Sequence, residues 1–332
     1  MARMPAIAFF LLAIGWVGAQ DAGVQKAPPG VAALVNDKPL YETAVQRGLD
    51  RVPPEKKAQA RKELVSHLVE NMLVDQYLQQ QKVAVEPGEV DKRLGQMREE
   101  VIKQGKEFTK MLEELKLSEA ELKEHITAEV RWEKFVDSQA NDKVLKETFQ
   151  QNKEVFDGSS VRARHILLNM NAAEAGGEEK VRGQIASLKK TIDDEVNGGL
   201  AKLLPGTDSL IKEKTRTALV DEAFANVARK KSECPSKDQG GDVGWFGRDG
   251  DMVENFSKTA FTQSVYQVSE PVKTQFGFHL ILTTERKLGK EVKFEEVQGE
   301  VKEYFAEKLK ERLAEHVKKF SRVQIFPAPA GL

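Results

Sequence analysis

The segment Val161-Arg-Ala-Arg-His-Ile-Leu-Leu168 marks the point where the pattern of the chain changes. It is rich in β-branched and aliphatic residues and lies between two long stretches with helical periodicity, so it predicts a buried strand. A second apolar segment, Gly277-Phe-His-Leu-Ile-Leu282, predicts the last strand of the same domain. We therefore expect a compact domain in which strands and helices share one core.

The sequence between these two strands supplies the remaining elements of the domain. A glycine-rich loop, Gln239-Gly-Gly-Asp242, separates helical texture from a short strand pattern. The expected order β-α-α-β-α-β-β implies an α+β domain with a mostly antiparallel sheet and surrounding helices. The intervening elements are predicted as helices over about 178–195, 221–231 and 254–261 and extended segments at 243–246 and 270–272.

The sequences on both sides of this domain have helical periodicity. Apolar residues recur at steps of three and four in 64–73, 90–101 and 122–130, and again from Phe294 to Phe320. A helix with one apolar stripe is not stable alone in water, so we expect the C-terminal helix to pack on the N-terminal helices. The prediction is an all-α body built from both ends of the chain, preceded by a short strand at Val31–Val35.

Two pairs of polar residues predict where helices of this body begin. Thr43 with Gln46, and Ser118 with Glu121, have the spacing of a capping box. In that motif the two side chains satisfy backbone N–H groups at the helix start. We therefore expect helix starts next to Thr43 and Ser118.

The N-terminus has the pattern of an export signal. Arg3 precedes the uncharged apolar run Ala6–Val17, and Val17-Gly18-Ala19 provides a cleavage site before Gln20. The run is too short to cross a hydrocarbon layer of about 30 Å as a helix, which argues against the alternative of an uncleaved anchor. We predict a signal peptide over 1–19, a disordered linker over 20–30, no membrane span after cleavage, and a location in the periplasm or cell envelope.

Composition limits the class of protein. The 332 residues carry 51 basic and 52 acidic side chains, a formal net charge of −1, so whole-chain electrostatics favours neither nucleic acid nor an anionic membrane as partner. With 40% apolar and 31% charged residues the chain is typical of a soluble protein. Its single cysteine, Cys234, cannot form an internal disulfide, so packing must hold the fold.

Three short segments resemble the parvulin, or PpiC-type, family of peptidyl-prolyl cis/trans isomerases. They are Arg164–Leu167, Ser232–Gly244 and Thr274–His279, and the resemblance covers about 161–286. The helical flanks resemble the chaperone bodies of SurA- and PrsA-like exported folding factors. The resemblance implies a helical chaperone-like domain over 31–157, an isomerase domain over 158–288 with an extra segment at about 197–218, and a C-terminal helix over 289–326 that packs on the N-terminal domain.

The resemblance also implies roles for individual residues. His165 and His279 correspond to paired histidines on neighbouring strands, with Thr274 in the same hydrogen-bonded cluster, and Cys234 lies beside the substrate peptide bond. The residues implied to hold the proline ring are Val243, Met252, Phe256 and Phe276.

The chemistry of such a site needs no cofactor and no metal. Rotation about the amide bond faces a barrier of about 18–20 kcal/mol because amide resonance is lost, yet no bond is cleaved. An apolar pocket can bind the twisted amide better than either planar form and can remove water from it. We expect unfolded or proline-containing polypeptides as clients; a holding chaperone with a weak or inactive isomerase domain is the alternative, and the oligomeric state is open.

Other functions remain open from the residues alone. Cys234 with two histidines is also compatible with a thiol hydrolase, although Pro235 removes a backbone donor next to the thiol. His165, His279 and Asp242 could be read as metal ligands, although no close pair of ligands appears in the sequence. Both histidines could be structural. The segment Asn169–Glu179 contains no Lys or Arg, which argues against specificity for phosphorylated substrates.

Overall fold

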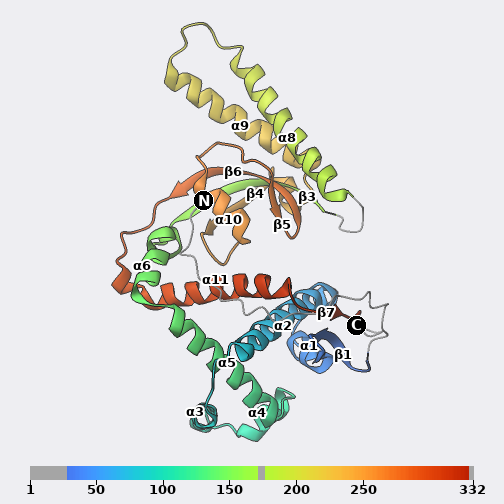
Figure 1. The fold of residues 1–332 in the computed structure, drawn as a ribbon. Helices are drawn as coiled ribbons and strands as arrows, with labels where there is room; N and C mark the ends of the chain where they lie inside the picture. The colour runs from blue at the N-terminus through green and yellow to red at the C-terminus, as the bar shows by residue number, and fades with distance from the viewer. Residues whose placement is uncertain (1–27, 171–175, 329–332) are drawn as a thin grey trace. The chain divides into compact units, whose positions relative to one another are not determined.

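The computed structural model describes residues 28–170 and 176–328 (Figure 1). The predicted signal peptide and most of the predicted linker lie outside the described residues. The chain forms two compact units: unit 1 falls within Met1–Thr148 and Gln298–Leu332, and unit 2 within Phe149–Val297. Among the described residues, no helix combines the length and the apolar character needed to cross a membrane.

Unit 1 is built mainly from helices of both chain ends. The C-terminal helix α11 packs on α2, where Val74 and Leu78 contact a cluster containing Leu313 and Ala314. The predicted packing of the C-terminal helix on the N-terminal helices is therefore confirmed. The elements are α1 (Glu42–Leu49), η1 (Pro54–Lys56), α2 (Lys57–Gln80), α3 (Pro87–Lys103), α4 (Phe108–Glu114), α5 (Glu119–Gln139), α6 (Asp142–Gln151), which continues into unit 2, and α11 (Gln298–Lys318).

Unit 1 also contains a three-stranded antiparallel sheet, ordered β2-β1-β7, so the prediction of an all-α body is wrong in this respect. The predicted strand β1 (Val31–Val35) pairs with β2 (Lys38–Tyr41) and with β7 (Val323–Ile325). Sequence reasoning missed β2 and β7 because segments of three or four residues are too short to show a period of two. The sheet joins the two ends of the described chain, with Ala33 opposite Ile325.

The two predicted helix starts have different outcomes. At Ser118 the capping box is confirmed: its Oγ accepts from the N–H of Glu121 at 3.2 Å, and its own N–H donates to Glu121 Oε2 at 2.9 Å. Next to Thr43 a helix does begin, but the capping box is wrong: β2 runs directly into α1 at Glu42, and its N-cap residue, Tyr41, makes no side-chain cap hydrogen bond. Gln46 instead donates to the Glu42 carboxylate at 3.3 Å.

Unit 2 has the α+β fold and the order of elements that the sequence predicts. Its four strands form one antiparallel sheet in the order β4-β3-β6-β5. The elements are α7 (Lys153–Phe156), β3 (Ser160–Asn169), α8 (Gly177–Leu200), α9 (Ser209–Lys231), η2 (Pro235–Gln239), β4 (Asp242–Gly247), α10 (Glu254–Thr262), β5 (Val272–Thr274), β6 (Gly277–Lys287) and η3 (Phe294–Glu296).

The two faces of this sheet have different neighbours because successive strand residues point to opposite faces. On one face Ile166 and Leu280 pack in a core with α8 and α9. On the other face Val161 and Ile281 pack in a core with α10. Figure 1 shows the α8–α9 hairpin and α10 on opposite sides of the strands. By this alternation, the side chains of His165 and His279 lie on the face that packs against α10.

The extra segment at 197–218 lengthens both helices of the α8–α9 hairpin. The helix α8 ends at Leu200 and α9 begins at Ser209, so the eight residues 201–208 connect them. A Cβ added at Gly199 would lie 2.7 Å from Leu219 Cδ1, so glycine permits close approach of the two helices. The segment therefore forms the outer part of a helical hairpin.

Candidate functional site

The two histidines of unit 2 meet on one face of the sheet. They lie on the neighbouring strands β3 and β6, where His165 is opposite Ile281 and His279 is opposite Leu167. The two histidines are offset by two residues in the strand register, so both imidazoles lie on the same face of the sheet. Their Nδ1 atoms are 3.1 Å apart, and the rings stack with 5.4 Å between centroids and 17° between planes.

Two hydroxyl groups extend this contact into a chain of four side chains. Thr274 Oγ1 is 2.8 Å from His279 Nε2, and Ser236 Oγ is 3.1 Å from His165 Nε2. The Phe276 N–H donates to Thr274 Oγ1 at 3.1 Å, so the Thr274 hydroxyl already accepts one bond and is free to donate its proton to His279. With that proton on Thr274, His279 donates from Nδ1 to His165 Nδ1, and His165 donates from Nε2 to Ser236 Oγ. The Ser236 O–H group then remains available to another partner.

Burial keeps both imidazoles neutral near pH 7. His165 and His279 are 6% and 4% exposed. Removal from water lowers the pKa of His165 to about 4, and the same cause, with the nearby His165, lowers the pKa of His279 to about 4. A neutral pair with one donor and one acceptor at the Nδ1 contact is compatible with the 3.1 Å distance, whereas two cations would repel.

An apolar cluster lies against the histidine pair. The Phe256 ring stands nearly perpendicular to both imidazoles, at 80° to His165 and 83° to His279, with centroid distances of 5.4 and 5.6 Å. Phe256 packs in a core with Phe246 and Phe261, and Val243 and Met252 border that core as partly buried side chains. The structure therefore brings three of the four predicted proline-binding residues together. Phe276 is 47% exposed and lies outside this cluster; only its backbone N–H joins the site.

Cys234 stands two residues before Ser236 in the chain, but its thiol does not join the polar chain. It directly precedes η2, and its N–H donates to Ser232 Oγ at 3.3 Å. Among the described residues its thiol forms no hydrogen bond with either imidazole, since His165 Nε2 is bonded to Ser236. Sequence reasoning missed Ser236, although it stands two residues after Cys234 in a segment that the family resemblance had already singled out.

The glycine turn after η2 fixes this arrangement. Gly240 and Gly241 have φ values of +67° and +82°, which side-chain-bearing residues rarely adopt. A Cβ at Gly241 would lie 2.3 Å from the His165 carbonyl oxygen. The His165 N–H donates to Gly241 O at 2.8 Å, and the Gly241 N–H donates to Ser236 O at 2.9 Å. The turn therefore sets the position of Ser236 relative to His165.

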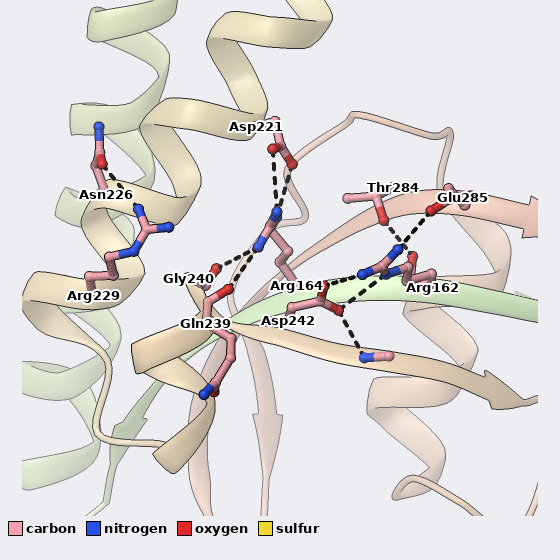
Figure 2. Close-up of polar contacts among 11 residues, drawn as sticks. Arg162, Arg164, Asp221, Asn226, Arg229, Gln239, Gly240, Asp242, Thr284 and Glu285 are labelled. Carbon is pink, nitrogen blue, oxygen red and sulfur yellow. Dashed lines mark hydrogen bonds and ion pairs between the residues drawn. The ribbon is translucent and has the colours of Figure 1, made fainter.

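Arg164, next to His165 on β3, holds the same turn from the other face of the sheet. Figure 2 shows its guanidinium between Asp221 of α9 and the carbonyl groups of Gln239 and Gly240. It donates to Asp221 Oδ1 at 2.9 Å and to Gln239 O and Gly240 O at 3.0 and 3.3 Å. This single side chain links α9, β3 and the end of η2, and a planar guanidinium is suited to such a fork.

Asp242 is engaged in structure rather than held for a metal. Arg162 Nη2 donates to its Oδ2 at 2.7 Å, and the Gly244 N–H donates to its Oδ1 at 2.9 Å (Figure 2). Burial alone would raise the pKa of Asp242, but these hydrogen bonds with Arg162 and Gly244 hold it below its usual value. Within the described residues no group of three potential ligands is arranged to hold a metal ion.

Comparisons with known proteins show what part of unit 2 is similar to. The family model "Rotamase: PPIC-type PPIASE domain" matches residues 207–285. The match starts in the α8–α9 loop and does not include β3, which carries His165.

Curated relatives are foldases. The Foldase protein PrsA of Bacillus subtilis is 29% identical over 195 residues, 58% of this chain and 52% of that protein. The Foldase protein PrsA 3 of Bacillus cereus is 30% identical over 240 residues, 71% of this chain and 66% of that protein. The chain spans about half the length of the first curated relatives it matches. Among solved structures, peptidylprolyl isomerase PrsA of Bacillus anthracis has a TM-score of 0.42 at 20% identity, covering 77% of this chain and 96% of that one.

Proposed function

We propose that the chain is a peptidyl-prolyl cis/trans isomerase that assists protein folding, because a PpiC-type rotamase family model matches residues 207–285 and curated relatives are named foldases. The observation that carries this proposal is the neutral histidine pair set edge-on against the Phe256 cluster. Such a site offers an apolar surface and fixed hydrogen bonds, which is what rotation of an amide requires.

The geometry supports catalysis by binding rather than by bond cleavage. Val243, Met252 and Phe256 supply an apolar wall for a proline ring, and burial against it removes water from the preceding amide. Loss of water disfavours the charge-separated resonance form of the amide and so lowers the barrier to rotation. The Ser236 hydroxyl, placed by His165, is available to bond a twisted peptide group more strongly than a planar one.

The thiol hydrolase alternative is weaker on this geometry. A nucleophilic cysteine needs a base within hydrogen-bond reach. Here both nitrogen atoms of His165 already have partners, Ser236 and His279, and the same holds for His279 with Thr274. We therefore assign Cys234 a place at the wall of the site, where a small side chain of moderate polarity is sufficient.

The clients and the compartment belong to the same proposal. We infer that the chain is exported to the periplasm or cell envelope by its N-terminal segment and acts on X-Pro bonds of unfolded secreted or envelope proteins. Support comes from the signal-like pattern at 1–19 and from relatives named as foldases.

A protease-coupled assay on proline-containing peptides tests the isomerase activity. We expect the full chain to accelerate cis-to-trans conversion above the uncatalysed exchange, which takes tens to hundreds of seconds. A rate equal to that of the uncatalysed control, together with suppression of aggregation of an unfolded protein, would instead identify a holding chaperone with an inactive isomerase domain.

Two substitutions separate the roles of Phe256 and Cys234. We expect Phe256→Ala to lose most of the activity, because the apolar wall disappears, and Cys234→Asp to keep a substantial part of it. Phe256 is 3% exposed, so the alanine variant also loses about 3–5 kcal/mol of stability, and far-UV circular dichroism must show that it is folded. Phe320→Ala, at a 67% exposed position, is the matched control. Complete loss in both site variants, with the control active, would favour nucleophilic chemistry.

A further inference from the structure

The loop between α8 and α9 presents an exposed apolar tip. Its side chains Leu204, Leu210 and Ile211 are 78%, 70% and 54% exposed. In Figure 1 this loop lies at the end of the hairpin far from the strands of unit 2. The hairpin residues that pack against the core of unit 2 reach only to Leu200 and Leu219, so the tip has no core to enter. Large aliphatic side chains gathered in this way mark an interaction site.

The backbone of the loop holds these side chains in place. The Thr207 N–H donates to Leu204 O at 3.1 Å, closing a turn with Pro205 and Gly206 at its centre, and Gly206 has a φ of +85°. The Asp208 carboxylate then caps α9 and accepts from the Leu210 N–H at 2.8 Å. An ordered loop pays little entropy on binding, so the exposed apolar tip is prepared for a partner.

The charge around the tip is positive. Lys202, Lys212 and Lys214 are exposed, and within the described residues none of their ammonium groups forms an ion pair. The nearby carboxylates are engaged, since Asp208 caps the helix and Glu213 pairs with Arg216 at 2.7 Å. The balanced charge of the whole chain, which argued against an anionic membrane as partner, therefore hides a local excess of positive charge.

These features favour a lipid surface over a protein partner. The few exposed side chains of the tip fall far short of the roughly 800 Å² per partner that a stable dimer buries. A lipid surface needs only shallow insertion of aliphatic groups with cations at the phosphates. We propose that the α8–α9 tip docks on an anionic lipid surface, with Leu204, Leu210 and Ile211 inserted and the three lysines at the headgroups.

Cosedimentation of the full chain with vesicles tests this proposal. The vesicles contain either phosphatidylcholine alone or equal parts of phosphatidylcholine and phosphatidylglycerol. We expect stronger partitioning to the anionic vesicles, weakened by salt. The variant Leu204→Ser/Leu210→Ser/Ile211→Ser should lower the partition coefficient at least about tenfold. The variant Lys202→Gln/Lys212→Gln/Lys214→Gln should lower it on the order of a hundredfold and remove most of the salt dependence.

Matched variants elsewhere on the surface give the controls. Leu288→Ser/Ile102→Ser removes side chains that are 85% and 60% exposed, and Lys62→Gln/Lys103→Gln/Lys106→Gln removes three exposed lysines of unit 1. All variants keep the same N-terminal segment, so a difference between them reports on the tip, and all should keep isomerase activity.

Three results would overturn the proposal. The first is equal partitioning of wild type and both tip variants. The second is a loss that the control variants reproduce. The third is an apolar tip variant that binds vesicles like wild type but no longer binds a permanently unfolded polypeptide, or no longer self-associates in sedimentation velocity. Either of these losses would assign the tip to a protein partner.

Discussion

The three-stranded sheet of unit 1 and the four-stranded sheet of unit 2 each lie beside a buried pair of polar residues, and the two pairs differ in charge. In unit 1, Arg61 Nη2 and Glu42 Oε2 are 2.7 Å apart, with side chains 8% and 10% exposed. In unit 2, His165 and His279 are equally buried but neutral at pH 7, because burial lowers the pKa of each to about 4.

The difference shows which buried polar groups serve structure and which can serve a site. The Arg61 guanidinium lowers the pKa of Glu42 and also donates to Phe326 O at 3.4 Å, so it joins the start of α1 to the chain after β7. A charge pair with this many partners is fixed. The imidazole chain instead ends at the Ser236 hydroxyl, beside apolar side chains that a substrate can cover. We infer that neutrality is what allows the second pair to border an apolar cluster at tolerable cost.

The largest difference in stability between the two units is expected from Gly241→Ala, in the glycine turn after η2. Gly241→Ala places a Cβ against the His165 carbonyl at a φ of +82°, so β3 or the turn must move. We expect a loss on the order of 4 kcal/mol from unit 2 and loss of isomerase activity. Urea unfolding of the full chain measures the first: in a Trp132→Phe background the fluorescence of Trp245 follows unit 2, and in a Trp245→Phe background that of Trp132 follows unit 1. A stable, active variant would show that the turn does not set the position of Ser236.

A slightly smaller effect is expected from breaking the buried ion pair of unit 1. Arg61→Ala leaves the Glu42 carboxylate buried without its partner, which costs about 3 kcal/mol. The unfolding transition of unit 1 should shift, while isomerase activity of the folded protein stays unchanged. The double variant Arg61→Met/Glu42→Leu should recover most of the loss, because no unpaired charge remains. If the double variant is as unstable as Arg61→Ala, shape rather than charge governs this position.

Acid should separate the two units. The pKa of each buried histidine is lowered from 6.5 to about 4, so the unfolded state binds more protons between these values. Stability of unit 2 is therefore complete above pH 6.5 and falls as the pH drops toward 4, by about 2 kcal/mol for each histidine at pH 5. The pKa of Glu42 is lowered from 4.5, so its contribution to unit 1 is lost only below pH 4.5.

Urea midpoints at pH 7 and pH 5 measure this difference. Only the transition of unit 2 should move, and His165→Gln/His279→Gln should reduce its pH dependence. A shift of equal size in that double variant would mean that other groups cause the acid sensitivity.

The smallest effect is a gain in unit 1. A Cβ added at Gly95, within α3, meets no atom within 4 Å, and the residue has ordinary helical φ. Gly95→Ala should stabilise unit 1 by roughly 0.8 kcal/mol, since alanine has the higher helix propensity. The unfolding transition of unit 1 measures the gain, with isomerase activity unchanged. A higher free energy of unfolding in Gly95→Ala and a lower one in Gly241→Ala would show that glycine is required at the turn and incidental in the helix.

Long periodic elements were predictable from the sequence. The strands containing His165 and His279, the order of elements in unit 2, and the packing of the C-terminal helix on the N-terminal helices all follow from apolar periodicity. Short elements were not: β2 and β7 have four and three residues, and α1 begins at Glu42, directly after β2, without the capping box predicted at Thr43.

The site shows the same division. The residue types of His165, His279 and Phe256 and their places on neighbouring elements could be read from the sequence with the family resemblance. The bond between Ser236 and His165 could not, because it depends on two positive-φ glycines and on Arg164, which hold the end of η2 against β3. The ion pair of Arg61 with Glu42 was equally hidden, since nothing local distinguishes a buried charge from an exposed one.

By itself the sequence determined the α+β class of unit 2 and the helices of unit 1, because a period of 3.6 or 2 along the chain records which face of an element is buried. The tertiary structure alone decided which polar atoms meet, that the thiol of Cys234 stays outside the imidazole chain, and that the apolar residues of the α8–α9 tip are left uncovered. The physical reason is range. Burial patterns repeat over many residues of one element, whereas a hydrogen bond of about 3 Å depends on the relative placement of elements far apart in the chain.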